Sequence, residues 1–174
     1  MKRVVLTFLI VIFLLVFQTT WFPFFPIHRF RPDLLLIFTL SLGFLFPPFW
    51  GGVLAFFIGY LMDLFSGNGL GFYTLSRPLV FFAAQFFKER FYLEGFYSQC
   101  LFVFIFAMLE GLLILILMST FRSVPLKNIY PLWFTFLLPQ SFFTGLVTPF
   151  LFSIFGQGFS LLFRSPKEGI KERR

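Results

Sequence analysis

Charged side chains, cysteine and histidine are all scarce in this chain, and each shortage excludes a class of protein. Only 12% of the 174 residues are charged, whereas 59% are hydrophobic and 34 are phenylalanine. A soluble domain of this composition would expose contiguous apolar patches, so we expect the chain to lie in a lipid bilayer. The single cysteine, Cys100, excludes an internal disulfide bond.

Residues suited to catalysis are equally scarce. The one histidine, His28, lies between the first two apolar runs, which excludes a histidine metal pair or a serine–histidine dyad within the membrane. Asp63 and Glu110 belong to different apolar runs and do not form the paired acidic motif that a Mg²⁺-dependent enzyme requires. We therefore expect no enzyme activity, no metal and no cofactor.

Breaks in the apolar pattern predict an all-α bundle of six transmembrane helices. About 20 apolar residues are needed to cross a bilayer. The first run follows Lys2 and Arg3 but lacks a small-x-small cleavage pattern, so we interpret it as a retained helix. The expected helices cover residues 4–21, 32–46, 50–65, 72–87, 96–120 and 130–155. They form one membrane domain, residues 1–163, followed by a basic tail, residues 164–174.

Prolines mark the ends and bends of these helices. Pro47 and Pro48 are expected to end the second helix, because a proline cannot donate a backbone hydrogen bond and disfavours helix in the residue before it. Pro78 lies early in the fourth helix, and Pro139 and Pro149 are expected to bend the last one.

Positive charges are distributed unequally between the two sides of this arrangement. Nine lie on the side of the termini (Lys2, Arg3, Lys88, Arg90, Arg164, Lys167, Lys171, Arg173 and Arg174) and four on the other (Arg29, Arg31, Arg122 and Lys127). The positive-inside rule therefore predicts that both termini are cytoplasmic. This topology and attraction to anionic lipids explain the net charge of +7, so nucleic-acid binding is not expected.

Three ionisable residues, Asp63, Arg77 and Glu110, fall within expected helices. Each would cost at least about 2.5 kcal/mol if it faced lipid, so each should face the bundle interior, a partner or water. The turn after Asp63 brings the next helix back alongside, which predicts a buried ion pair with Arg77, either structural or part of a ligand or proton pathway. Glu110 is expected to meet Arg77, to meet a polar group of the last helix, or to be a protonated acid within the packing.

Two helices carry stripes of small or polar residues. Gly51, Ala55 and Gly59 recur at four-residue spacing on the third helix, and Gln140 and Thr144 lie on a comparable stripe of the sixth. Such faces let two helices approach closely. They either pack within the chain or receive the single transmembrane helix of a partner.

A motif of charged, proline and glycine residues surrounds the second and third helices. Proline suits a first helical turn, and an aspartate there complements the helix dipole. The segment Arg31-Pro32-Asp33 therefore predicts the start of a helix. After Asp63 the chain enters a polar, glycine-rich turn that ends at Gly71. Together with length and helix count, these residues make the chain resemble the rod shape-determining protein MreD family. The residues that carry the resemblance are Arg31, Pro32, Asp33, Ser66, Gly67 and Gly71.

The resemblance implies a fold, a function and a set of partners. The fold would be a six-helix bundle similar to the substrate-binding subunits of energy-coupling-factor vitamin transporters. The function would be a noncatalytic scaffold of the Rod complex in the bacterial inner membrane, supporting rod shape and lateral peptidoglycan synthesis. The partners would be the bitopic protein MreC and, directly or indirectly, MreB filaments, RodA and a penicillin-binding transpeptidase.

A vitamin-type transporter subunit is the alternative function. Such a subunit would hold a small molecule near the outer face, around Asp63, Asn68 and Arg77. It would need an enclosed polar pocket with several convergent hydrogen-bonding groups, whereas a scaffold needs a groove or an apolar face filled by another helix.

Overall fold

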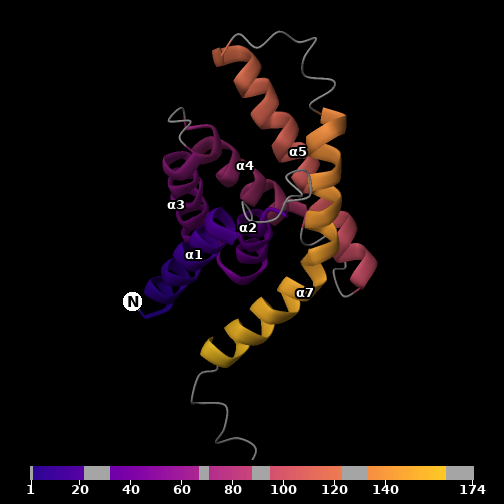
Figure 1. The fold of residues 1–174 in the computed structure, drawn as a ribbon. Coiled ribbons are helices and arrows are strands. Elements are labelled where there is room, and N and C mark those ends of the chain that lie inside the picture. Colours follow the sequence, from indigo (N-terminus) through magenta and orange to yellow (C-terminus); the bar gives the residue numbers. More distant parts are fainter. Residues whose placement is uncertain (1, 22–31, 67–70, 88–94, 123–132, 164–174) are drawn as a thin grey trace, which may run out of the picture.

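The computed structural model describes residues 2–21, 32–66, 71–87, 95–122 and 133–163, and this part of the chain is entirely helical apart from short connections (Figure 1). Its helices are α1 (Lys2–Trp21), α2 (Leu34–Leu45), α3 (Pro48–Ser66), α4 (Phe72–Phe87), α5 (Phe96–Arg122) and α7 (Leu138–Phe163). A π-helical turn, η3 (Trp133–Leu137), leads directly into α7. The all-α expectation is therefore confirmed for the described residues.

The helix bounds agree with those predicted from the sequence except for the last helix, where the described part begins with the π-helical turn and α7 ends at Phe163 instead of Phe155. The bounds of α4 are the ones predicted, although Pro78 lies inside this helix. The third helix starts earlier than predicted, at Pro48, because a proline in the first turn has no backbone N–H that needs a partner. The expected basic tail, residues 164–174, and the charged segment 88–90 lie outside the described residues.

Helix length and hydropathy fit a membrane protein but do not establish six crossings. Three helical segments are long and apolar enough to span a bilayer: Pro48–Ser66, Phe96–Phe121 and Phe134–Phe155. The apolar segments Thr7–Thr20 and Leu34–Phe44 are shorter. The count of six crossings and the likeness to vitamin-transporter subunits stay predictions.

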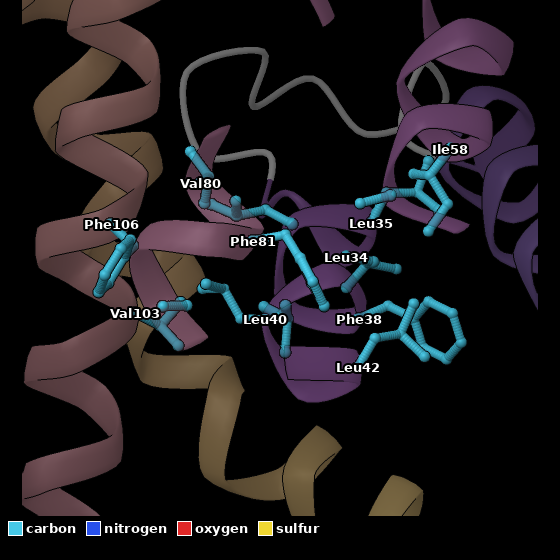
Figure 2. Packing of buried hydrophobic residues seen from close by; sticks show 14 of the residues in the cluster. Leu34, Leu35, Phe38, Leu40, Leu42, Ile58, Val80, Phe81, Val103 and Phe106 are labelled. Atoms are coloured by element: carbon cyan, nitrogen blue, oxygen red, sulfur yellow. The ribbon is translucent and has the colours of Figure 1, made fainter. Parts of the chain in front are cut away.

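Helix α2 lies at the centre of the fold and is buried on every side. It packs against α1, α3, α4, α5 and α7, and Figure 1 shows it between α1, α3 and α4 on one side and the long pair α5 and α7 on the other. Leu35, Ile37, Phe38 and Leu40 are each at most 1% exposed. A helix that is apolar around its whole circumference belongs in a core. Figure 2 shows its side chains meeting those of α3, α4 and α5.

Both ends of α2 receive polar partners from elsewhere in the fold. With 12 residues α2 is only about 18 Å long, shorter than the hydrocarbon core of a bilayer, so its end groups need partners within the protein. At its start the carboxylate of Asp33 accepts a hydrogen bond from the backbone N–H of Leu36 at 2.9 Å. At its end the Gln85 amide of α4 donates to the carbonyl oxygens of Gly43 and Phe46, at 3.0 and 2.9 Å. These contacts give partners to some of the backbone groups at the helix ends, which an apolar environment would otherwise leave unpaired.

The glycine stripe of α3 packs inside the chain against α4. Gly51, Ala55 and Gly59 are all buried. A Cβ atom on Gly59 would overlap the backbone carbonyl of Tyr73, and it would lie 2.8 Å from the Cα of Thr74. Of the two uses predicted for this stripe, the structure shows the intramolecular one, so the stripe is not an open seat for a partner helix.

Helices α5 and α7 form a second close pair. A Cβ atom on Gly145 of α7 would lie 2.8 Å from the backbone oxygen of Cys100 on α5, so the two backbones nearly touch there. Figure 1 shows α7 changing direction between its first, orange part and its last, yellow part. Pro149 lies inside this helix, where the missing backbone hydrogen bond accounts for a bend.

Candidate functional site

The side chain of Arg77 lies at the centre of a buried ionic cluster. It projects from α4 and is 0% exposed. Its Nη2 atom donates a hydrogen bond to Oδ2 of Asp33 at 2.5 Å, and its Nε atom lies 3.2 Å from Oε1 of Glu110. The two carboxylates come from the start of α2 and the middle of α5, so one guanidinium links three helices.

Asp33 has two roles, each served by one carboxylate oxygen. Its Oδ1 atom caps α2, and its Oδ2 atom accepts from Arg77. Its backbone N–H donates to the Oγ1 atom of Thr144 on α7 at 3.1 Å, and that hydroxyl donates in turn to the carbonyl oxygen of Gln140 at 2.7 Å. The start of α2 is therefore tied to both α4 and α7, which explains why a proline–aspartate helix start lies here.

Glu110 receives both of its polar contacts from α4. The hydroxyl of Ser76 donates to Glu110 Oε1 at 3.0 Å, and Arg77 approaches the same oxygen. Of the alternatives predicted for Glu110, the structure shows the contact with Arg77. Ser76 was not predicted as part of the site, although its position next to Arg77 in the sequence could have indicated it.

The cluster contains more acid than base and leaves part of Arg77 unpaired. Two carboxylates face one guanidinium, and the Nη1 atom of Arg77 is buried without a hydrogen-bond partner among the described residues. The guanidinium carbon lies 5.9 Å from the centre of the Tyr73 ring, which gives a cation–π contact, and the Met62 sulfur lies 3.1 Å from Nη2. Removing charges from water is expensive, so the cluster depends on keeping all three partners together.

The structure corrects the predicted Asp63–Arg77 ion pair. Asp63 instead caps the start of α4: its carboxylate accepts from the backbone N–H groups of Tyr73 and Thr74, at 3.1 and 2.7 Å, and from the Thr74 hydroxyl at 2.6 Å. Gly71, with a φ of 73°, turns the chain into α4 in a conformation that favours glycine. The positive end of the α4 helix dipole therefore stabilises the Asp63 carboxylate, in place of the predicted partner Arg77.

Replacing Asp63 with alanine is expected to loosen the start of α4. The change removes the acceptor of three hydrogen bonds and leaves the backbone N–H groups of Tyr73 and Thr74 without this partner. We therefore expect the free energy of unfolding to fall by about 1–3 kcal/mol. Thermal unfolding of the purified protein in mild detergent, followed by circular dichroism, measures this loss. Asp63→Asn keeps one acceptor oxygen and should lose less; equal stability of Asp63→Ala and the native protein would contradict the capping role.

A cavity of about 140 Å³ adjoins the ionic cluster between α2, α4, α5 and α7. Its lining residues are Asp33, Leu36, Tyr73, Ala107, Glu110, Gly111, Ile114, Leu115, Leu137, Gln140, Ser141 and Thr144. Gln140 and Thr144, predicted as a helix-packing or partner stripe, therefore border this cavity. No group of three histidine, cysteine, aspartate or glutamate side chains suited to a metal ion occurs within the described ranges.

The residues of the sequence motif fall at the two helix starts that build the site. Pro32 and Asp33 lead into α2, and Gly71 precedes α4. The Ser66 hydroxyl donates to the carbonyl oxygen of Asp63 at 3.4 Å, at the end of α3. Arg31 and Gly67 lie outside the described residues, so their predicted roles are not tested.

The fold and the ionic cluster define a helical membrane protein with a polar centre enclosed by apolar helices. The family model of the rod shape-determining protein MreD matches residues 1–157, so the chain belongs to the MreD family. This membership connects the chain with the determination of rod shape in cells. Searches of curated proteins and of solved structures gave no match.

Proposed function

We propose that this protein is a noncatalytic scaffold subunit of the bacterial cell-elongation complex and binds the transmembrane helix of an MreC-like bitopic partner. Membership of the MreD family supports the role in rod shape. The observation that supports a helix as the ligand is an apolar groove between α5 and α7. Its volume is about 550 Å³, and Phe96, Tyr97, Cys100, Leu101, Phe104, Phe142, Gly145 and Leu146 line it.

The groove combines a small-residue floor with large apolar walls. Gly145 and Cys100 lie where the backbones of α5 and α7 approach each other. Leu101 and Leu146 stand at its sides and are 56% and 52% exposed. The close approach that Gly145 permits is used within the chain, against the Cys100 backbone, so the groove offers a partner helix its apolar walls, against which side chains of that helix can interlock. Both helices of the groove belong to candidate membrane spans, so its occupant is itself embedded in the membrane.

The exposed face of α3 suits a partner helix less well. Its small residues Gly51 and Gly59 are buried against α4, and the opposite face presents bulky side chains such as Trp50, Phe56 and Leu64. A face of exposed bulky side chains can contact fluid lipid chains, whereas the groove offers a hollow between two helices. The partner prediction therefore moves from the α3 stripe to the groove between α5 and α7, whereas Gln140 and Thr144 of the other predicted stripe border the polar cavity.

The proposed topology has six crossings in the inner membrane with both termini in the cytoplasm. It rests on the asymmetry of nine positive residues against four in the sequence. In this arrangement the basic tail, residues 164–174, lies beside anionic lipid and near the cytoplasmic MreB filaments. RodA and its penicillin-binding transpeptidase are direct or indirect partners through the same complex.

The size of the polar cavity disfavours the transporter alternative. Pockets for small-molecule ligands usually measure about 300–1,000 Å³. The cavity beside Glu110 measures about 140 Å³, so it lacks room for a vitamin-sized molecule. Asp63 and Arg77, predicted beside such a ligand, do not line this cavity, and Asn68 lies outside the described residues.

Filling the groove is expected to release the partner without unfolding the protein. Leu146→Trp places a bulky aromatic ring in the groove. The helix bundle should tolerate the change, because the side chain at this position is 52% exposed. Overpacking of this kind usually costs about 1–3 kcal/mol, which corresponds to roughly 5- to 150-fold weaker binding of the partner. Copurification of a tagged protein with its MreC-like partner in mild detergent measures the effect.

Leu64→Trp is the matched control, because Leu64 is 59% exposed on α3 and lies outside the groove. Both variants should accumulate in the membrane, and only Leu146→Trp should lose the partner and give rounded cells in a rod-shaped host. Full partner recovery with Leu146→Trp, or loss with Leu64→Trp alone, would contradict the groove as the binding site.

A further inference from the structure

The cavity beside the ionic cluster contains a buried polar group that the fold does not use. Ser141 is 1% exposed and lines the cavity, and its hydroxyl oxygen has no hydrogen-bond partner among the described residues. Serine hydroxyls in helices usually donate to a carbonyl one turn earlier, as Thr144 and Thr148 do on the same helix. A buried polar group without a partner is unusual, which indicates that a ligand supplies one.

The charges that face the cavity are negative. Asp33 and Glu110 line it, whereas Arg77 lies behind them and neutralises one of the two carboxylates. Both contacts that Glu110 makes with the described polar groups use Oε1, so its other oxygen is left for the cavity. The Gln140 amide at the rim adds another acceptor oxygen. A carboxylate, a hydroxyl and an amide match the three N–H donors of a primary ammonium group.

The volume limits how much of a ligand can enter. A water molecule occupies about 30 Å³ in the liquid, so a cavity of about 140 Å³ holds a group of only a few non-hydrogen atoms. Leu36, Ala107, Ile114 and Leu137 give the lining an apolar wall, and Tyr73 and Thr144 also line the cavity. An ammonium on a short carbon chain fills such a space, with its charge at Glu110 and its carbons against the apolar wall.

We infer that this cavity is a binding site for a primary alkylammonium group, held by Glu110, Ser141 and Gln140. Two sources carry this chemistry: a free small amine and the ethanolamine headgroup of a membrane lipid. The site is separate from the partner groove between α5 and α7, since the two share no lining residue. Its test therefore does not depend on the proposed scaffold role.

Thermal unfolding of the full chain in mild detergent tests the inference, with ethylammonium chloride as the probe at constant ionic strength. The unfolding midpoint should rise with ethylammonium and reach saturation. Tetramethylammonium, which has the charge but no N–H, and ethanol, which lacks the charge, should have no saturable effect. Ser141→Ala should fold as the native protein does, because its hydroxyl bonds nothing, yet require at least about tenfold more ethylammonium.

Ser41→Ala provides the matched control, because Ser41 is also buried but its hydroxyl donates to Phe38 within α2, outside the cavity. This variant should respond to ethylammonium as the native protein does, whatever its own stability. Equal responses of Ser141→Ala and the native protein, an equal effect of tetramethylammonium, or no saturable response would overturn the inference. The last result would mean that water alone fills the cavity.

A second measurement separates the two sources. Native mass spectrometry of protein released from phosphatidylglycerol nanodiscs, with and without added phosphatidylethanolamine, shows whether that lipid is retained. Retention by the native protein but not by Ser141→Ala identifies the lipid headgroup. Response to ethylammonium without such retention identifies a free amine.

Discussion

Arg77→Met should be among the most damaging single substitutions in the described part of this protein. Methionine fills a similar volume but leaves the carboxylates of Asp33 and Glu110 buried without their cation. Breaking a buried pair in this way costs about 3–5 kcal/mol, because the charges that remain cannot return to water. We expect the variant to be degraded, with little protein left in isolated membranes by quantitative immunoblotting.

The triple variant Asp33→Asn, Arg77→Met, Glu110→Gln is the control for this prediction. It removes all three charges together, so no uncompensated charge remains, and it should accumulate better than Arg77→Met alone. Additive losses across the three positions would show that the residues do not act as one cluster. Replacing Asp63 should not rescue Arg77→Met, because Asp63 caps α4 and does not pair with Arg77.

Gly59→Leu is expected to remove the protein from the membrane. Even the first atom of a side chain at this position would overlap the Tyr73 backbone, and a backbone cannot move aside as a side chain can. Helix α4 would have to separate from α3. This separation would also break the capping of α4 by Asp63 and displace Arg77. Membrane accumulation, compared with a native control expressed to the same level, measures the effect.

Two alanine substitutions on the same helix give a sharper comparison. An alanine Cβ at Gly52 would meet only the end of the half-exposed Phe82 ring, 2.7 Å away, and that ring can rotate into lipid. Gly52→Ala should therefore be tolerated, whereas Gly59→Ala should lower the unfolding midpoint by the equivalent of about 1–3 kcal/mol. Similar midpoints for the two variants would contradict the close backbone contact between α3 and α4.

Much of the fold could be predicted because hydropathy and helix breakers are local properties. The bounds of α4 and the start of α5 follow from apolar runs bordered by polar turns. The position of α2 at the centre could have been predicted as well, because its apolar residues occupy every face. The arrangement of α5 with α7 could not, since their small residues do not indicate which helix they contact.

The site was predicted less well, because it depends on which ends of helices meet. The sequence predicts a cation beside Asp63, whereas the positive end of α4 supplies its partner through backbone N–H groups. Asp33 was interpreted as the start of a helix, which is right, but its second oxygen also pairs with Arg77. The role of Gln85 is not predicted, because nothing in the local sequence shows that it faces unpaired carbonyl groups at the end of α2.

The central claim, that the groove between α5 and α7 receives a partner's transmembrane helix, is tested most directly by photo-crosslinking in cells. A photoreactive amino acid at position 146 should form an adduct with the MreC-like partner, since Leu146 lines the groove. The same probe at position 64, on the lipid-facing side of α3, should form none. An adduct at position 64 and none at position 146 would contradict the account.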